Sequence, residues 1–211
     1  MSSEKAEPLS MDSVPEPARK RPRAGERRVQ ILQTLAAMLQ QPGGERITTA
    51  ALAAQLQVSE AALYRHFASK AQMFEGLIDF IEQSLMALVR QVQERESAGP
   101  AQAARILTMV LHFAEKNPGM TRVMTGEALV LENERLQERM NLLFDKIEAV
   151  LRQSLREGAA ASAQALTPQA DAQAKASLMM AFALGRLQQF SRSGFKRSVM
   201  LHLDSVLALI N

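Results

Sequence analysis

Apolar side chains recur every three or four positions along most of this chain, which is the spacing of a helix that buries one face. Segments of this kind are separated by Gly and Pro, as at Pro42-Gly43-Gly44 and Gly99-Pro100. The first helix is predicted to end before Pro42, and others to cover about 48–56, 59–66, 101–116, 120–126, 128–157, 168–190 and 199–210, with a loop over 158–167. A longer helix begins at Ser69 with an apolar stripe as far as Leu88, and Gly99-Pro100 ends the region after it.

Three hydroxyl residues stand at the starts of predicted helices: Thr48, Ser59 and Ser69. Such side chains accept hydrogen bonds from the free backbone N–H groups of the first turn. No segment alternates apolar and polar residues over the length of a strand, so the predicted fold class is all-α. We expect an N-terminal extension with a basic arm over 1–25, a three-helix head over 26–70 and a larger helical-bundle body over 71–211.

Composition narrows the classes of function. The 211 residues include no Cys, which excludes a disulfide scaffold and a thiolate zinc site. No stretch approaches the roughly 20 apolar residues of a membrane helix, and no secretory signal is recognisable, so we expect a cytoplasmic protein without a membrane partner. His66, His112 and His202 are far apart in sequence, and neither a nucleophile elbow nor a phosphate-binding Gly loop occurs. We therefore expect neither an enzyme nor a bound cofactor or metal.

The net charge of +3 is concentrated in one segment. Residues 1–18 hold four acids and one base, and residues 71–211 hold equal numbers of both signs. Residues 19–70 hold nine bases and three acids, and six of those bases fall between Arg19 and Arg28. A local excess of this kind is typical of a surface that binds a polyanion, either nucleic acid or anionic lipid. Lipid binding would favour a long basic amphipathic helix with an exposed apolar face, which the sequence lacks.

The segment Ile47–Lys70, ITTAALAAQLQVSEAALYRHFASK, predicts a helix-turn-helix. Two short helices flank Leu56-Gln57-Val58 and share a small apolar core. In this motif the second helix enters the major groove of DNA, while the first crosses the phosphate backbone. We therefore predict DNA contacts for Arg23, Arg27 and Arg28 of the arm and for Thr48, Thr49, Ser59, Glu60, Ala61, Ala62, Tyr64, Arg65, His66 and Lys70.

Several of these residues also have a purely structural interpretation. Thr48 and Ser59 can serve as helix caps alone. Tyr64 can be a half-buried ring, and His66 can be an ordinary surface histidine. The basic excess beside the motif favours DNA binding over these alternatives.

The residues of this motif resemble the DNA-binding head of TetR-type regulators. The similarity covers roughly residues 25–75; it is carried by the motif from Thr48 to Lys70, which includes the string Tyr64-x-His66-Phe67-x-x-Lys70. The resemblance implies a TetR-like homodimer that binds palindromic double-stranded DNA, with Tyr64, His66 and Lys70 on phosphates. One position departs from the family, since Gln57 stands where the turn often has Gly. The turn is then either strained, at roughly 1–2 kcal/mol for a left-handed residue, or shaped differently.

A longer part of the chain, about 27–196, is similar to nucleoid occlusion factors of that family. Phrases such as RITTAALAAQ and EKNPGMTRVMTGEAL carry the similarity. It implies a nucleoid-associated protein, with one or more dimers per DNA site, that binds the C-terminal tail of the division GTPase FtsZ while on DNA and blocks the division ring. The alternative is a transcriptional repressor released by a small ligand, whose body should contain a wide cavity with convergent polar groups.

Apolar side chains beyond the core stripes mark a candidate groove for that acidic tail. Phe80 lies about 100° off the stripe of its helix, and Met109 and Phe113 form a second pair on the helix over 101–116. An apolar floor with basic edges suits an acidic, partly apolar peptide. Packing of these side chains inside the body is the alternative. The predicted groove residues are Phe80, Arg90, Met109, Phe113, Lys116 and Asn117, with Arg105 nearby.

The last two predicted helices are the candidates for the dimer interface. A dimer suits DNA because two heads about 34 Å apart match successive major grooves of a palindrome. The alternative is that the apolar residues of these helices form intramolecular core. The predicted interface residues are Leu178, Met179, Phe182, Phe190, Val206 and Ile210.

Overall fold

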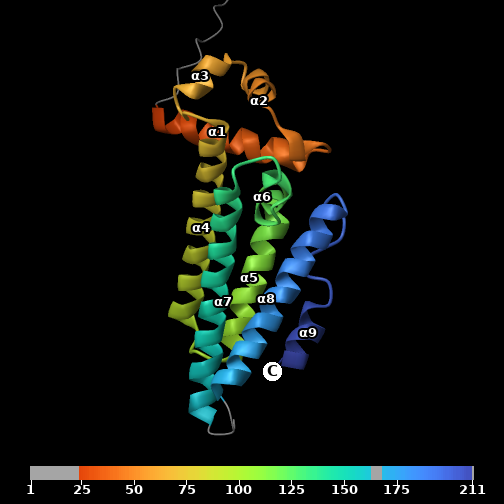
Figure 1. Cartoon of the computed structure of the whole chain (residues 1–211). Helices are drawn as coiled ribbons and strands as arrows, with labels where there is room; N and C mark the ends of the chain where they lie inside the picture. Colours follow the sequence, from red (N-terminus) through yellow and green to blue (C-terminus); the bar gives the residue numbers. More distant parts are fainter. Residues whose placement is uncertain (1–23, 163–167, 211) are drawn as a thin grey trace, which may run out of the picture.

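The computed structural model describes residues 24–162 and 168–210, and all regular structure in these ranges is helical. The all-α prediction is thereby confirmed for the described part of the chain. Arg23 and the rest of the predicted extension before residue 24 lie outside the described residues. Figure 1 shows a small group of helices set across one end of an elongated bundle.

Three helices form the head: α1 (Ala24–Gln40), α2 (Thr49–Gln55) and α3 (Glu60–Tyr64). A short 3₁₀ turn, η1 (Gly44–Arg46), follows the Pro-Gly-Gly sequence that ends α1. Leu35, Leu52 and Leu63 contribute one buried side chain from each helix. So small a core buries little surface, and α1 also packs on the body through α4 and α6.

The described part of the body consists of six helices and one 3₁₀ turn, and its first helix rises into the head. In chain order they are α4 (Lys70–Arg95), α5 (Pro100–Lys116), α6 (Pro118–Met124), η2 (Glu127–Leu129), α7 (Glu134–Ser162), α8 (Pro168–Arg192) and α9 (Leu203–Ile210). α7 and α8 pack along one another, and both contact α5. In Figure 1, α8 ends near the head and α9 lies beside it at the edge of the bundle.

Three predicted boundaries are corrected. α7 begins at Glu134 and not near 128, because the Asn133 side chain accepts a hydrogen bond of 3.0 Å from the Arg135 backbone N–H and so caps the helix there. α7 continues to Ser162, over part of the predicted loop, in agreement with the high helix propensity of its alanines. α9 begins at Leu203 and not at 199, because His202 is left-handed (φ 65°) and cannot continue a right-handed helix.

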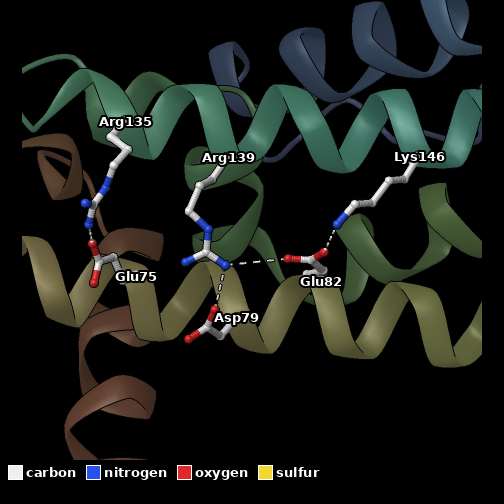
Figure 2. A network of polar contacts seen from close by, with 6 residues as sticks. All are labelled: Glu75, Asp79, Glu82, Arg135, Arg139 and Lys146. Atoms are coloured by element: carbon white, nitrogen blue, oxygen red, sulfur yellow. Dashed lines mark hydrogen bonds and ion pairs between the residues drawn. The ribbon is translucent and has the colours of Figure 1, made fainter.

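A ladder of ion pairs joins α4 to α7 (Figure 2). Arg139 lies 2.6 Å from Asp79 and 3.5 Å from Glu82, and Lys146 lies 2.5 Å from Glu82. The residue numbers of the paired side chains increase together along the two helices, so α4 and α7 run in the same direction. The hydrogen bond with Asp79 raises the pKa of Arg139 above its ordinary value, although its burial acts in the opposite sense. The remaining pair of the ladder is Arg135 with Glu75.

Candidate nucleic-acid interface

Hydroxyl caps begin both helices of the helix-turn-helix. The Thr48 hydroxyl accepts from the Ala51 backbone N–H at 3.1 Å, and the Ser59 hydroxyl accepts from the Ala62 N–H at 3.3 Å. Between the helices, Gln57 is left-handed with φ of 55°. The turn therefore has the strained form of the two alternatives that the sequence leaves open.

A chain of side-chain hydrogen bonds fixes α3 against α2. The Tyr64 hydroxyl donates to Thr49 Oγ1 at 3.4 Å, and the Thr49 hydroxyl donates in turn to Glu60 Oε2 at 2.6 Å. The acid in the first turn of α3 is thus held by the neighbouring helix. The two hydrogen bonds hold the Glu60 carboxylate against Thr49 of α2 and help to fix the angle between α2 and α3.

The outer face of α3 is available to a partner. Ser59, Glu60, Ala61 and Arg65 are exposed, and Tyr64 is 45% exposed, while Leu63 points into the core. Ala62 is half-buried and lines a groove of about 440 Å³ between α1 and α3, together with Arg27, Arg65 and His66. A small-residue surface with cations at its edges is what a helix needs to approach base edges closely.

Arg28 ties α1 to the segment after α3. Its guanidinium carbon lies 4.1 Å from the centre of the Phe67 ring, and its Nη1 donates to the backbone carbonyl of His66. The residue is also exposed to solvent. A structural role is therefore evident for Arg28, beside the DNA contact that we predict for it.

Lys70, the first residue of α4, pairs with an acid near the start of α7. Its ammonium nitrogen lies 2.5 Å from Glu132 Oε1, in the segment between η2 and α7, and 5.7 Å from the centre of the Phe74 ring. The lysine side chain is 33% exposed and the glutamate side chain 11%. Sequence reasoning missed this partner, because the two residues are distant along the chain.

The candidate groove residues Phe80 and Phe113 lie at the same height in the body. α4 and α5 pack as antiparallel neighbours joined near Gly99. Counted from that junction at 1.5 Å per residue, Phe80 and Phe113 are both about 20 Å along their helices. Phe80 is 49% exposed, whereas Phe113 and Met109 are half-buried against the core.

The predicted polar rim of this groove is spread along the two helices. Lys116 and Arg90 are exposed. Arg90 is ten residues beyond Phe80, about 15 Å farther down α4. The Asn117 amide donates at 2.7 Å to the carbonyl of Phe113, and Arg105 lies 3.5 Å from Glu96. Lys116 is thus the rim cation level with Phe80.

The predicted dimer-interface residues divide into two groups. Leu178 is 55% exposed, and Phe182 and Val206 are half-buried, so these side chains have surface to offer. Met179 and Phe190 are only 1% and 3% exposed because they pack in the core of their own protomer, so these two side chains have little surface to offer to a second copy. The Ile210 side chain lies outside the described ones.

Sequence reasoning missed Leu184, which is 40% exposed on α8, and Leu209, which is 86% exposed on α9. Each lies off the buried stripe of its helix, and this offset is the feature of the sequence that could have identified them as exposed apolar residues.

In residues 24–162 and 168–210, no three or more His, Asp or Glu side chains gather closely enough to hold a metal ion. In the same part of the chain, the helices are too short or too polar to cross a membrane.

Two family models match the chain. A model for bacterial regulatory proteins of the tetR family matches residues 31–77, and a SlmA-like model, described as a tetracyclin repressor-like C-terminal domain, matches residues 101–210. The nucleoid occlusion factor SlmA of Idiomarina loihiensis is 49% identical over 179 residues, which cover 85% of this chain and 90% of that protein. SlmA of Shewanella sediminis is 49% identical over 178 residues, covering 84% and 89% of the two chains.

Solved structures share the architecture. The regulator FadR from Bacillus subtilis, in complex with stearoyl-CoA, gives a TM-score of 0.66 at 16% identity over 86% of this chain and 96% of that one. The TetR-family regulator PfmR from Thermus thermophilus gives 0.66 at 21% identity, with the same coverage. These likenesses confirm the TetR-like fold that the helix-turn-helix residues imply.

Proposed function

Since this chain belongs to the SlmA group of the TetR family, we propose that it is a nucleoid occlusion factor, which binds palindromic DNA as a homodimer and blocks FtsZ assembly over the chromosome. The observation that carries the proposal is the exposed outer face of α3 in a chain 49% identical to SlmA proteins. The protein would act in the cytoplasm, on the nucleoid.

DNA binding follows from the charge and shape of the head. Arg27 and Arg65 line the groove between α1 and α3, Arg28 donates to the His66 carbonyl just after α3, and Lys70 begins α4. Thr48 caps the start of α2, and Ser59 caps the start of α3. Cations and helix starts hold phosphates, while the small Ala61 permits close approach to the bases. Recognition would therefore combine sequence-independent phosphate contacts with base contacts from α3.

The groove of Phe80, Met109 and Phe113 is the proposed site for the FtsZ tail. Its exposed phenyl ring and its half-buried neighbours offer apolar contact, and Lys116 supplies a cation at the same height. An extended acidic peptide with apolar side chains would match both features.

A ligand-released repressor is less well supported by the body interior. Leu107, Leu111, Met140 and Leu187, from the three helices at its centre, are each 0% exposed. A cavity wide enough for water would expose part of the side chains that line it. The described interior around these four residues is therefore filled by side chains.

The DNA proposal is tested with a duplex that the protein itself selects from random sequence. Tyr64→Ala and Lys70→Ala should weaken binding to all sequences, and Lys70→Ala should reduce the slope of log affinity against log salt by about 1. Arg156→Ala, which removes an exposed cation at the far end of α7, is the control. Unchanged affinity and slope in the first two variants would remove them from the DNA contacts.

The partner proposal is tested by sedimentation of FtsZ polymers with this protein, with and without the selected duplex. Inhibition should require the duplex. Phe80→Ala and Phe113→Ala should keep DNA affinity and lose inhibition, whereas Leu142→Ala, at a 57% exposed position on α7, should keep both. If both phenylalanine variants still inhibit FtsZ on DNA, the groove assignment is wrong.

A further inference from the structure

A buried arginine joins the head to the body. Arg122 of α6 has a side chain only 8% exposed, and its Nη1 donates to two backbone carbonyls, of Leu39 at 2.9 Å and of Gln41 at 2.8 Å. These carbonyls end α1, where a helix carries partial negative charge and unsatisfied acceptors. The guanidinium therefore completes the C-terminus of a head helix from within the body.

The other contacts of Arg122 lead to the end of α8. Its Nε lies 3.6 Å from Glu127 Oε1, and the second oxygen of Glu127 accepts a hydrogen bond from the Ser191 hydroxyl of α8. Its guanidinium carbon lies 5.0 Å from the centre of the Phe195 ring, just beyond α8. One side chain thus connects α1, η2 and the C-terminal end of α8.

The surroundings of Arg122 leave the junction little freedom. A Cβ atom on Gly44 would lie 2.8 Å from Arg122 Nη1 and 2.7 Å from the carbonyl oxygen of Leu39. Only glycine therefore fits at this position without a shift of the backbone. Phe195 is left-handed (φ 65°), an uncommon conformation for an aromatic residue. Its ring is held between the guanidinium of Arg122 and the ring of Phe190, whose centre is 5.2 Å away.

We propose that Arg122 is a positioning residue that fixes the head relative to α8 and thereby sets the separation of DNA half-sites that the dimer accepts. The proposal rests on the proposed function, because it requires DNA binding by a dimer that uses α8. In such a dimer the two heads are connected only through the two bodies. The stiffness of each head–body junction then determines how strongly the dimer rejects a wrong spacing.

Half-site spacing makes a sensitive probe of that stiffness. Two extra base pairs between half-sites move one of them by about 7 Å along the axis and rotate it by about 70°. A rigid junction cannot follow this change, whereas a loosened junction can. A defect confined to protein stability would lower affinity equally at all spacings.

The test measures affinity for the selected palindrome, for versions with one or two base pairs added or removed, and for a single half-site. The affinity of the wild-type protein should fall by about tenfold or more at the wrong spacings, which is comparable to the effect of a mismatched base pair in the site. Arg122→Lys keeps the positive charge but loses the planar guanidinium that donates to the two carbonyls at the end of α1. In this variant, the loss of affinity at wrong spacings should fall below about threefold, and affinity for a single half-site should be unchanged. Ser191→Ala removes only the link from Glu127 to α8 and should give a smaller effect in the same direction.

Arg186→Lys is the matched control. Arg186 is also buried, and it donates to the carbonyls of Val199, at 3.2 Å, and Ser198, both in the segment between α8 and α9. Neither carbonyl belongs to the head, so the control should keep the wild-type spacing penalty. A wild-type penalty in both Arg122→Lys and Ser191→Ala would overturn the proposal. Failure of wild type to bind any palindrome would instead refute the proposed function.

Discussion

At the scale of single residues, the DNA contact that we propose for Lys70 would compete with an ion pair of the DNA-free protein. The ammonium group that we expect on a DNA phosphate is paired with Glu132, at 2.5 Å, in the DNA-free protein. A phosphate that binds this lysine would weaken its pairing with the carboxylate. The proposed DNA contact would therefore be opposed by an ion pair between the start of α4 and the segment that leads into α7.

Glu132→Gln should raise DNA affinity by roughly three- to tenfold, because it removes the competitor for Lys70. Fluorescence anisotropy with a labelled duplex measures the effect. Glu134→Gln changes the same charge at an exposed position two residues away and controls for general repulsion between carboxylates and DNA. In a Lys70→Met background the gain from Glu132→Gln should vanish, and a gain that persists there would show that Lys70 is not involved.

Gln57 stores strain in the turn of the helix-turn-helix. Gln57→Gly should stabilise the protein by about 0.5–1 kcal/mol, because relief of roughly 1–2 kcal/mol exceeds the extra backbone entropy that glycine loses on folding. Thermal unfolding should then shift upward by about 1–4 °C. Gln57→Ala keeps the Cβ atom and should not share the gain; equal melting temperatures for the two variants would argue against strain at this position.

At the scale of helices, the α4–α7 ladder in Figure 2 lies on a partly exposed surface, so its contribution is modest and depends on salt. Arg139→Gln should lower the free energy of unfolding by about 0.5–1 kcal/mol in dilute buffer and by much less at roughly 0.5 M salt. Urea titrations at both salt concentrations test this expectation. Arg156→Gln removes an exposed arginine of the same helix outside the ladder, and a loss as large as that of Arg139→Gln would mean that the ladder contributes nothing specific.

The contact of α1 with α6 depends on a missing side chain. A Cβ atom on Gly119 would lie 1.9 Å from the carbonyl oxygen of Ala36, and backbone cannot yield as a side-chain tip can. Gly119→Ala should therefore cost about 3 kcal/mol or displace the head. Gly25→Ala, at a helical glycine with nothing within 4 Å of the added atom, should be neutral or slightly stabilising. Urea unfolding of both variants measures the difference; a neutral Gly119→Ala would mean that α1 and α6 separate without cost.

Features that depend on neighbouring residues, such as helix caps, could be predicted from the sequence, whereas contacts between distant segments could not. The caps at Thr48 and Ser59 follow from neighbours two or three residues away, and the structure has both. The pair Lys70–Glu132 and the contact of Arg122 with Leu39 join residues 62 and 83 positions apart, and no periodicity encodes them. The burial of Met179 within its own protomer was unpredictable for a related reason, since helical spacing identifies apolar faces without saying what covers each one.

At the scale of the whole molecule, DNA binding and dimerisation are assigned to different parts. The cationic surface lies on the head, whereas the exposed apolar residues Leu178, Leu184 and Leu209 lie on the two C-terminal helices. In Figure 1 these helices lie together along one edge of the body. Contact between two such edges would bury apolar surface and leave both heads free.

Leu178→Glu tests this division. Because Leu178 is 55% exposed in the protomer, the change should leave the fold and the melting temperature of the protomer nearly intact. In a dimer it would bury a carboxylate, so sedimentation velocity should report a monomer. Affinity for the palindrome should fall by tenfold or more, roughly 1.4 kcal/mol, while binding to a single half-site persists. Leu142→Glu makes the same change at a 57% exposed position on α7 and should remain dimeric. A Leu178→Glu variant that stays dimeric would move the interface away from α8.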